Sequence, residues 1–368
     1  MNAKLLSLIF ILTLSASSCA QDKKNKGKNY SHEVVVDKLI IPWGFVFLPD
    51  NAMLITEKQG ILYHFKNGIK TEIQGLPDIK VLGQGGLMDI VLHPNYENTN
   101  WVYFSYASAS DKNTGANTTI MRAKLKGNTL VEKQILYKAI PDSNQAVHFG
   151  SRLAFDNEGY LYFSIGDRGN RDTNPQDITR DCGKIYRIHD NGNIPEDNPF
   201  VNHPKAKKAI YSYGHRNPQG MVLHPESGEI WTHEHGPRGG DEINIIHSGK
   251  NYGWSKVSYG INYDGSTFTK HTTLPGIEEP IHHWTPSIAP SGMAFVTGNT
   301  YPDWKDNLLV GSLKFQYLNR CVLKNNTVIQ EEKLLEGLGR VRTVKQGPDG
   351  YIYVGIENLG IVKIIPKK

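Results

Sequence analysis

The chain has 368 residues, of which 39% are hydrophobic and 21% charged, and it carries a formal net charge of +5. This is the composition of a globular protein, and the length suits one large all-β unit as well as two smaller domains. Part of the charge sits in a lysine-rich run at residues 23–28, which contains no aromatic residue. The run offers no platform for base stacking, so we expect a solvated linker and no nucleic-acid partner.

The first 19 residues are predicted to be a signal peptide. Lys4 gives a positive start, the apolar run 5–14 is too short to span a bilayer, and small residues lead to Cys19. The sequence Ala-Ser-Ser-Cys at residues 16–19 resembles a bacterial lipoprotein cleavage box, in which the cysteine is lipidated. The alternative is an ordinary cleavage site with an incidental cysteine. We therefore predict an exported protein, periplasmic or anchored to the outer membrane through Cys19.

Two further segments follow. Residues 20–33 are rich in Lys, Asn and Gly and are expected to form a flexible linker. Residues 34–368 show short β-rich runs separated by Gly, Pro, Asn and Asp, with no long helical periodicity. No part of them is apolar enough to span a membrane, and they are predicted to form a single domain.

A loose unit recurs along this domain: a Pro, Asp or Gly turn followed by a strand with an aromatic residue. The copies begin at Leu48, Leu92, Phe155, Leu223, Tyr301 and Gly347. Six units of about 50 residues match the size of a propeller blade and predict an all-β, six-bladed β-propeller. The alternative is a β-sandwich with coincidental turns. In a propeller, ligands bind at the mouth of the central channel, on loops from several blades.

Cysteine chemistry is limited in this domain. Cys182 and Cys321 are the cysteines left after export to an oxidising compartment, and the sequence does not decide whether they pair. No cysteine spacing is typical of a zinc site.

Two polar clusters suggest a ligand site. In residues 213–221, Arg216, Asn217 and Gln219 present a cation and two amides, which suit a planar, anionic ligand rich in carbonyl groups. Residues 234–246 combine a Gly236–Pro237 turn with nearby acidic groups, and calcium prefers carbonyl and carboxylate oxygens. Ordinary surface turns are the alternative for both clusters.

A third set of residues suggests acid–base chemistry beside a basic surface. His148 precedes one strand and Asp167 follows the next, so an antiparallel pair brings them together as a general-base arrangement. Arg340 and Arg342 share one strand face, and Lys314 adds a cation from the preceding blade. Each of these residues taken singly is equally consistent with a structural or surface role. The Walker loop, the Rossmann glycine fingerprint and the G-x-S-x-G elbow are missing, which argues against those enzyme classes.

Six motifs together resemble one family. GQGGLMDIVLHP, HFGSRLAFD with YFSIGDRG, GHRNPQGM, EHGPRGGDEIN, NYGW and GRVRTVKQGPDG occur in the order seen in soluble sugar dehydrogenases that depend on pyrroloquinoline quinone (PQQ). The resemblance runs from Pro42 to Ile365 and implies a six-bladed propeller with PQQ at the channel mouth. His235 stands where the glucose-specific branch has Gln, which favours the broader aldose branch.

The resemblance also implies roles for particular residues. His148 matches the general base, Asp167 the carboxylate behind it, and Arg216 and Asn217 the residues at the reactive quinone carbonyl. Other matches to PQQ contacts are Gln84, Tyr263, Lys314, Arg340 and Arg342. Gly236 and Pro237 match the carbonyls that hold a catalytic calcium ion, and Glu242 and Tyr252 resemble ligands of a second, structural calcium ion.

These roles imply oxidation of an aldose to a lactone, with electrons passed from PQQ to an external acceptor that the sequence leaves unidentified. Two other readings stay open from the residues alone. One is a calcium-dependent propeller lactonase or other hydrolase, which needs no cation cluster for a tricarboxylate. The other is a non-catalytic propeller that binds a partner at the cell surface, which needs no His148–Asp167 pair. The sequence is compatible with either a monomer or a homodimer.

Overall fold

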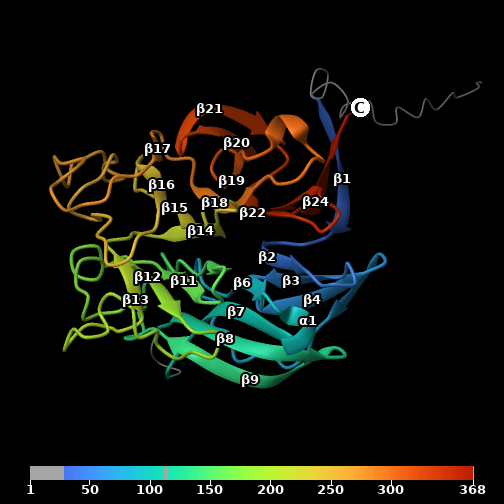
Figure 1. The fold of residues 1–368 in the computed structure, drawn as a ribbon, viewed down its shortest axis with the longest axis horizontal. Coiled ribbons are helices and arrows are strands. Elements are labelled where there is room, and N and C mark those ends of the chain that lie inside the picture. Colours follow the sequence, from blue (N-terminus) through green and yellow to red (C-terminus); the bar gives the residue numbers. More distant parts are fainter. Residues whose placement is uncertain (1–28, 112–114, 368) are drawn as a thin grey trace, which may run out of the picture.

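The computed structural model describes residues 29–111 and 115–367. Its strands form six antiparallel sheets of four strands each, which Figure 1 shows arranged around a common centre. The expected all-β, six-bladed propeller is confirmed.

In each blade the strands are ordered from the channel to the rim. In the first five blades they follow one another along the chain, whereas the outer strand of the sixth blade comes from the start of the chain. The strands of the first three blades are β2 (Pro42–Phe47), β3 (Met53–Glu57), β4 (Ile61–Lys66) and β5 (Ile69–Glu72); β6 (Leu87–Leu92), β7 (Trp101–Ser108), β8 (Asn117–Lys126) and β9 (Thr129–Lys138); β10 (Leu153–Phe155), β11 (Leu161–Ile165), β12 (Lys184–Ile188) and β13 (Ile210–Tyr213). Those of the other three are β14 (Pro218–Leu223), β15 (Ile230–Glu234), β16 (Asp241–Ile245) and β17 (His282–Trp284); β18 (Pro290–Phe295), β19 (Leu308–Ser312), β20 (Tyr317–Lys324) and β21 (Thr327–Leu334); β22 (Val341–Gln346), β23 (Ile352–Ile356), β24 (Gly360–Pro366) and β1 (Tyr30–Asp37). Two short helices, α1 (Tyr96–Thr99) and η2 (Pro302–Trp304), lie in turns of the second and fifth blades.

The two ends of the described chain meet in the sixth blade. β1 pairs antiparallel with β24, from Tyr30 opposite Pro366 to Asp37 opposite Gly360, and Figure 1 shows the two strands side by side. The strand begins at Tyr30, before the expected domain start at residue 34, because the ring closes only when a fourth strand completes this sheet. The Tyr30 hydroxyl accepts a hydrogen bond from the Leu335 N–H at 2.9 Å, which ties this first strand to the fifth blade's outer edge.

The six repeated units correspond to the six blades. Each copy covers the turn between the first and second strands of one blade, as Leu48 lies between β2 and β3 and Leu223 ends β14. The second strands are the most apolar because both of their faces are covered: β3, β11, β19 and β23 are buried throughout. The outer strand β21 is largely exposed. One hydrophobic cluster fills each of the six interfaces between neighbouring blades.

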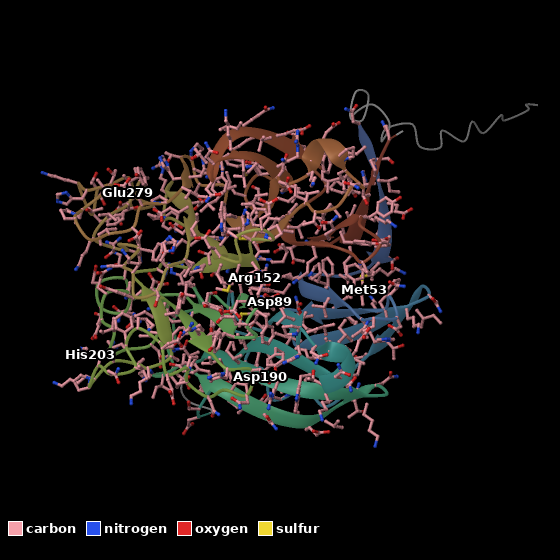
Figure 2. The ribbon with its side chains drawn as sticks, in the orientation of Figure 1. Met53, Asp89, Arg152, Asp190, His203 and Glu279 are labelled. Carbon is pink, nitrogen blue, oxygen red and sulfur yellow. The ribbon has the colours of Figure 1, made fainter. Side chains whose placement is uncertain are left out.

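The channel is closed by a polar cluster around Arg152, which Figure 2 shows with Asp89 near the middle of the ring. Arg152 is buried and donates to the Asp89 carboxylate at 3.1 Å and to the carbonyl oxygens of Gln219 and Arg342 at 2.7 and 2.9 Å. A longer bond of 3.3 Å reaches the Trp43 carbonyl. One guanidinium thus joins the inner strands of four other blades.

Three expectations concern export, anchoring and cysteines. The signal peptide and Cys19 lie outside the described residues. In the described part of the chain, no helix is long and apolar enough to cross a membrane. Cys182 and Cys321 are both buried and free, because they belong to the third and fifth blades.

Candidate active site

The predicted site residues gather at one end of the channel because of how the blades are connected. In each blade the first strand leaves this end and the second strand returns to it. Residues just before a first strand and just after a second strand therefore meet there. Asp167 follows β11, His235 follows β15, and Arg340 precedes β22.

His148 and Asp167 form a hydrogen-bonded pair, with His148 Nδ1 2.6 Å from Asp167 Oδ1. Asp167 Oδ1 also accepts from the Gly169 N–H at 2.8 Å, and Oδ2 accepts from the Trp254 indole at 2.7 Å. Three donors on one buried carboxylate fix its orientation. Because an ionised carboxylate only accepts, the Nδ1 of His148 carries the proton and Nε2 presents a lone pair.

The electrostatics keep this pair in the form that a general base needs. Burial and the charge of Arg216 lower the pKa of His148, and the contact with Asp167 offsets them only in part. Burial raises the pKa of Asp167, but the hydrogen bond and charge of His148, with Arg216 and Trp254, bring it below its usual value. The imidazole is therefore neutral and the carboxylate ionised near neutral pH.

The loop that carries His148 is held tightly in place. His148 itself has a φ of 57°, a left-handed conformation that the surroundings must impose. Its N–H donates to the side-chain oxygen of Gln84 at 2.9 Å. A Cβ at Gly85 would lie 2.6 Å from the Phe149 ring, so the glycines beside Gln84 allow this close approach.

Arg168 braces the same loop from the other side. It is buried and donates to the carbonyl oxygens of Gln145 at 2.6 Å and Ala116 at 3.1 Å, and also to that of Val147. Its guanidinium carbon lies 3.4 Å from the centroid of the Phe149 ring. Asp167 thus holds the imidazole ring of His148, and the adjacent Arg168 holds the backbone of the loop that carries it.

Arg216 and Asn217 enter the site from the loop before β14. Arg216 donates to the His235 carbonyl at 3.0 Å, and the Asn217 side-chain oxygen accepts from the Gly150 N–H at 3.0 Å. Among the described residues, Arg216 Nε and Asn217 Nδ2 are buried with no hydrogen-bond partner. Such donors are costly when unpaired, so they favour an acceptor-rich ligand.

A cavity of about 350 Å³ at the channel mouth is rich in cations. Gln84, Arg340 and Arg342 line it, as do Lys58 and Glu357, which were not predicted. Glu357 accepts from Arg340 Nε at 2.7 Å and from Arg342 Nε at 2.9 Å. Three cations thus face one carboxylate, which leaves the cavity positively charged.

A second, ion-sized cavity of about 10 Å³ lies beside it and shares His235 as a lining residue. Glu234 and Glu242 line it from directly opposite positions on β15 and β16. Burial and the charge of Glu234 raise the pKa of Glu242 to about 8. A buried carboxylate facing a half-buried one favours a bound cation, since a divalent ion would relieve their repulsion.

The predicted metal residues differ in their geometry around this cavity. Gly236 lines it, and Pro237 follows Gly236 in the same buried turn, fixed by a 2.8 Å bond from the Gly236 N–H to Asp241. Tyr252 also lines it, but its hydroxyl donates to the Ile245 carbonyl at 2.5 Å and accepts from the His247 N–H at 2.9 Å. A metal ligand from Tyr252 would therefore be its main-chain carbonyl.

Two predicted residues have exposed side chains outside these cavities. Tyr263 is 73% exposed on the long loop between β16 and β17. Lys314 follows β19 at the correct end of the channel but is exposed, with its ammonium 5.0 Å from the Phe315 ring centroid. Neither lines the two cavities at the channel mouth, and the same holds for four predicted residues that lie closer to the site: His148, Asp167, Asn217 and Pro237.

The model of the family described as Glucose / Sorbosone dehydrogenase matches residues 39–362. The chain belongs to this family. The resemblance read from the six motifs is thereby confirmed.

Members of the glucose/sorbosone dehydrogenase family are similar over most of the chain. Aldose sugar dehydrogenase YliI of Escherichia coli (strain K12) is 40% identical over 330 residues, which is 88% of this chain and 88% of that protein. Quinoprotein glucose dehydrogenase B of Acinetobacter calcoaceticus is 32% identical over 289 residues, covering 69% of this chain and 59% of that protein.

Solved structures agree with this placement. The apo form of the soluble aldose sugar dehydrogenase (Asd) from Escherichia coli has a TM-score of 0.87 at 38% identity, covering 92% of this chain and 100% of the other. The PQQ-bound aldose sugar dehydrogenase from Streptomyces coelicolor has a TM-score of 0.75 at 28% identity, covering 91% and 98%.

Proposed function

We propose that this protein oxidises aldose sugars at C1 to lactones, with PQQ and calcium at the channel mouth, and passes the electrons to an external acceptor. The observation that carries the proposal is a neutral, Asp167-oriented imidazole beside a cavity with excess positive charge. Gln84 joins the two parts, because it lines the cavity and also binds the His148 N–H. The 40% identity to an aldose sugar dehydrogenase supports the substrate class.

The residues of the cavity fit PQQ, a planar ortho-quinone with three carboxylates. Lys58, Arg340 and Arg342 would pair with the carboxylates, and Lys58 has a pKa lowered by burial and by Arg342, as expected where cations crowd. The unpartnered donors Arg216 Nε and Asn217 Nδ2 would bind the quinone oxygens. When bound, PQQ supplies the hydride acceptor, and the protein supplies position and field.

His148 then acts as the general base. Its Nε2 takes the proton of the anomeric hydroxyl while the hydride leaves C1 of the sugar. Asp167 holds the ring in the required tautomer and stabilises the charge that develops on it. The sugar loses a hydride from C1 and a proton from its hydroxyl, which together are two electrons and two protons. Its first product is therefore the lactone.

Calcium would occupy the turn and the acidic cavity beside this centre. The carbonyls of Gly236 and Pro237 would hold the ion that polarises the quinone. Glu242 and the Tyr252 carbonyl would hold a second, structural ion. The opposed carboxylates of Glu234 and Glu242 support a cation there. Export through residues 1–19 and tethering through Cys19 complete the proposal and rest on the sequence alone.

The test is reconstitution of the purified protein. Calcium and PQQ are added, and the reduction of an artificial dye is followed with several aldoses. Dye reduction that requires both additives and an aldose supports the proposal, and His148→Ala should lower turnover by about 10²–10⁴-fold. His203→Ala, which removes an exposed histidine of the third blade, is the matched control. Lactone hydrolysis without PQQ binding would favour the hydrolase instead.

A further inference from the structure

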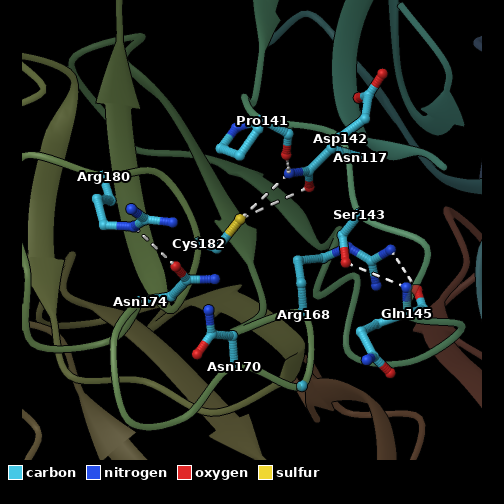
Figure 3. Close-up of a pocket in the computed structure, with 11 residues that line it drawn as sticks. Asn117, Pro141, Asp142, Ser143, Gln145, Arg168, Asn170, Asn174, Arg180 and Cys182 are labelled. Carbon is cyan, nitrogen blue, oxygen red and sulfur yellow. Dashed lines mark hydrogen bonds between the residues drawn. The ribbon is translucent and has the colours of Figure 1, made fainter. Parts of the chain in front are cut away.

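A larger cleft of about 430 Å³ lies beside the His148–Asp167 pair, between the second and third blades. Figure 3 shows Ser143 and Gln145 on one side and Arg180, Asn170 and Asn174 on the other. The proposed dehydrogenase chemistry uses none of these five side chains. The cleft is therefore a separate cavity whose contents the proposed reaction does not explain.

The floor of the cleft contains buried positive charge. Arg168, which lines it, donates to neutral carbonyl oxygens, and its buried Nε has no partner among the described residues. Lys184, buried directly beneath, donates to the carbonyls of Asn174 and Cys182, and burial lowers its pKa to about 8. Within residues 29–111 and 115–367, neither cation forms an ion pair with a carboxylate. Asp167 and Asp142 act on Arg168, and Asp181 and Asp177 act on Lys184, from a greater distance. A buried charge that no carboxylate contacts is only partly compensated, so an anion in the cleft would be favoured.

The acidic groups nearby are already paired. Asp142 binds Lys138 at 2.7 Å, and Asp181 binds Lys207 at 3.1 Å. Arg180 donates from Nε to Asn174 at 3.1 Å, and its terminal nitrogens point toward the middle of the cleft in Figure 3. The cations Arg168, Arg180 and Lys184 outnumber the remaining carboxylates, Asp167 and Asp177, by one, and Arg180 is placed to contact a ligand directly.

The remaining walls suit hydroxyl groups. Asn170 and Gln145 are exposed amides, each able to donate and accept, and Ser143 adds a hydroxyl. A guanidinium for a carboxylate, surrounded by amides for hydroxyls, is the complement of a small polyhydroxy acid. The cleft volume lies in the range of small-molecule sites.

We propose that this cleft binds an aldonate, the polyhydroxy carboxylate formed from a sugar lactone. The choice of this ligand rests on the proposed function: water opens the lactone ester, giving a hydroxyl, a carboxylate and one proton. Both walls of the cleft are connected to the catalytic pair. Gln145 lies on the loop that carries His148, and the Gly169 N–H donates to Asp167 at 2.8 Å. A bound aldonate therefore contacts the two segments that position the general base.

Calorimetric titration of the calcium-loaded, PQQ-free protein with sodium gluconate tests this proposal. We expect one gluconate per chain, no comparable binding of glucose, and at least tenfold weaker gluconate binding in Arg180→Gln. Arg171→Gln is the matched control, because it removes an equal charge at a neighbouring arginine that does not line the cleft. Asn170→Asp, an exposed substitution that keeps the side-chain size, should also abolish binding by repelling the carboxylate.

Three results would overturn the proposal: no gluconate binding, equal weakening by the two arginine variants, or glucose binding as tightly as gluconate. Binding of inorganic phosphate without gluconate would overturn the ligand class. Because PQQ is omitted, these outcomes are independent of turnover, and a dehydrogenase with an empty cleft would be recognised as such.

Discussion

Replacing Asp167 by Asn tests the general-base arrangement most sharply within the site. Asp167 accepts from His148, Gly169 and Trp254 on its two oxygens, and Asn keeps one acceptor oxygen. If the amide nitrogen faces Trp254, one hydrogen bond becomes a contact between donors, at a cost of about 1–3 kcal/mol. If it faces His148, the imidazole must move its proton to Nε2, where it no longer accepts a proton from the sugar.

Both orientations weaken the base, so we expect kcat/KM of Asp167→Asn to fall by about 10²–10⁴-fold at neutral pH, with little change in KM. The assay is steady-state dye reduction by the PQQ- and calcium-loaded enzyme, with unfolding curves to confirm the fold. Asp172→Asn is the control, because that side chain is 84% exposed. A loss of less than about tenfold would refute the role assigned to the pair, since general-base catalysis alone is worth more.

Three further predictions concern the residues around this pair. Arg152→Met should lower the free energy of unfolding by about 3–5 kcal/mol in a denaturant titration, because it leaves Asp89 buried and unpaired; a loss under about 1 kcal/mol would contradict the account. Arg168→Met should reduce kcat by a larger factor than it alters KM. It should also shift the acidic limb of the pH profile to higher pH, since the Arg168 charge helps to lower the pKa of His148. Arg168→Lys should restore that limb in part, and an unchanged profile in both variants would show that Arg168 serves the fold only. In the wild-type enzyme, kcat/KM should fall only below the ordinary pKa of histidine, because burial and the charge of Arg216 lower the pKa of His148; a midpoint above pH 7 would be inconsistent with a neutral base.

The fold was predictable because each repeat contains its own turn and its own buried strand. Leu48 and Leu223 mark equivalent positions in blades one and four, although the spacing between copies is uneven because the loops differ in length. The start of β1 was placed too late, because Tyr30 lies in a segment whose Lys and Asn content resembles a linker. Its strand is imposed by the distant partner β24 rather than by local sequence.

Contacts in the site could be predicted where both residues lie in one motif. They could not be predicted where one of the two residues is distant in the sequence. His148 and Asp167 flank one hairpin, so antiparallel geometry brings them together. Trp254 lies in the NYGW motif, but its bond to Asp167 joins residues 87 positions apart. No local pattern records such a contact.

Lys58 and Glu357 were missed although a signal was present. Both directly follow the second strand of their blade, as His235 does, and Asp167 lies one residue further along in its own blade. Since that position lies at the channel mouth in these blades, comparing it across the repeats would have identified both residues. Tyr263 lies in a long loop outside any repeat, where the register gives no guidance.

The central claim is that this channel mouth lets an aldose reduce PQQ. The most direct measurement is an anaerobic titration of the PQQ- and calcium-loaded protein with an aldose, followed by absorbance. The account predicts stoichiometric conversion of one quinone to its reduced form per chain, slowed by at least 100-fold in His148→Ala. A calcium-loaded protein that takes up no PQQ, or whose bound PQQ stays oxidised with every aldose tried, would contradict it.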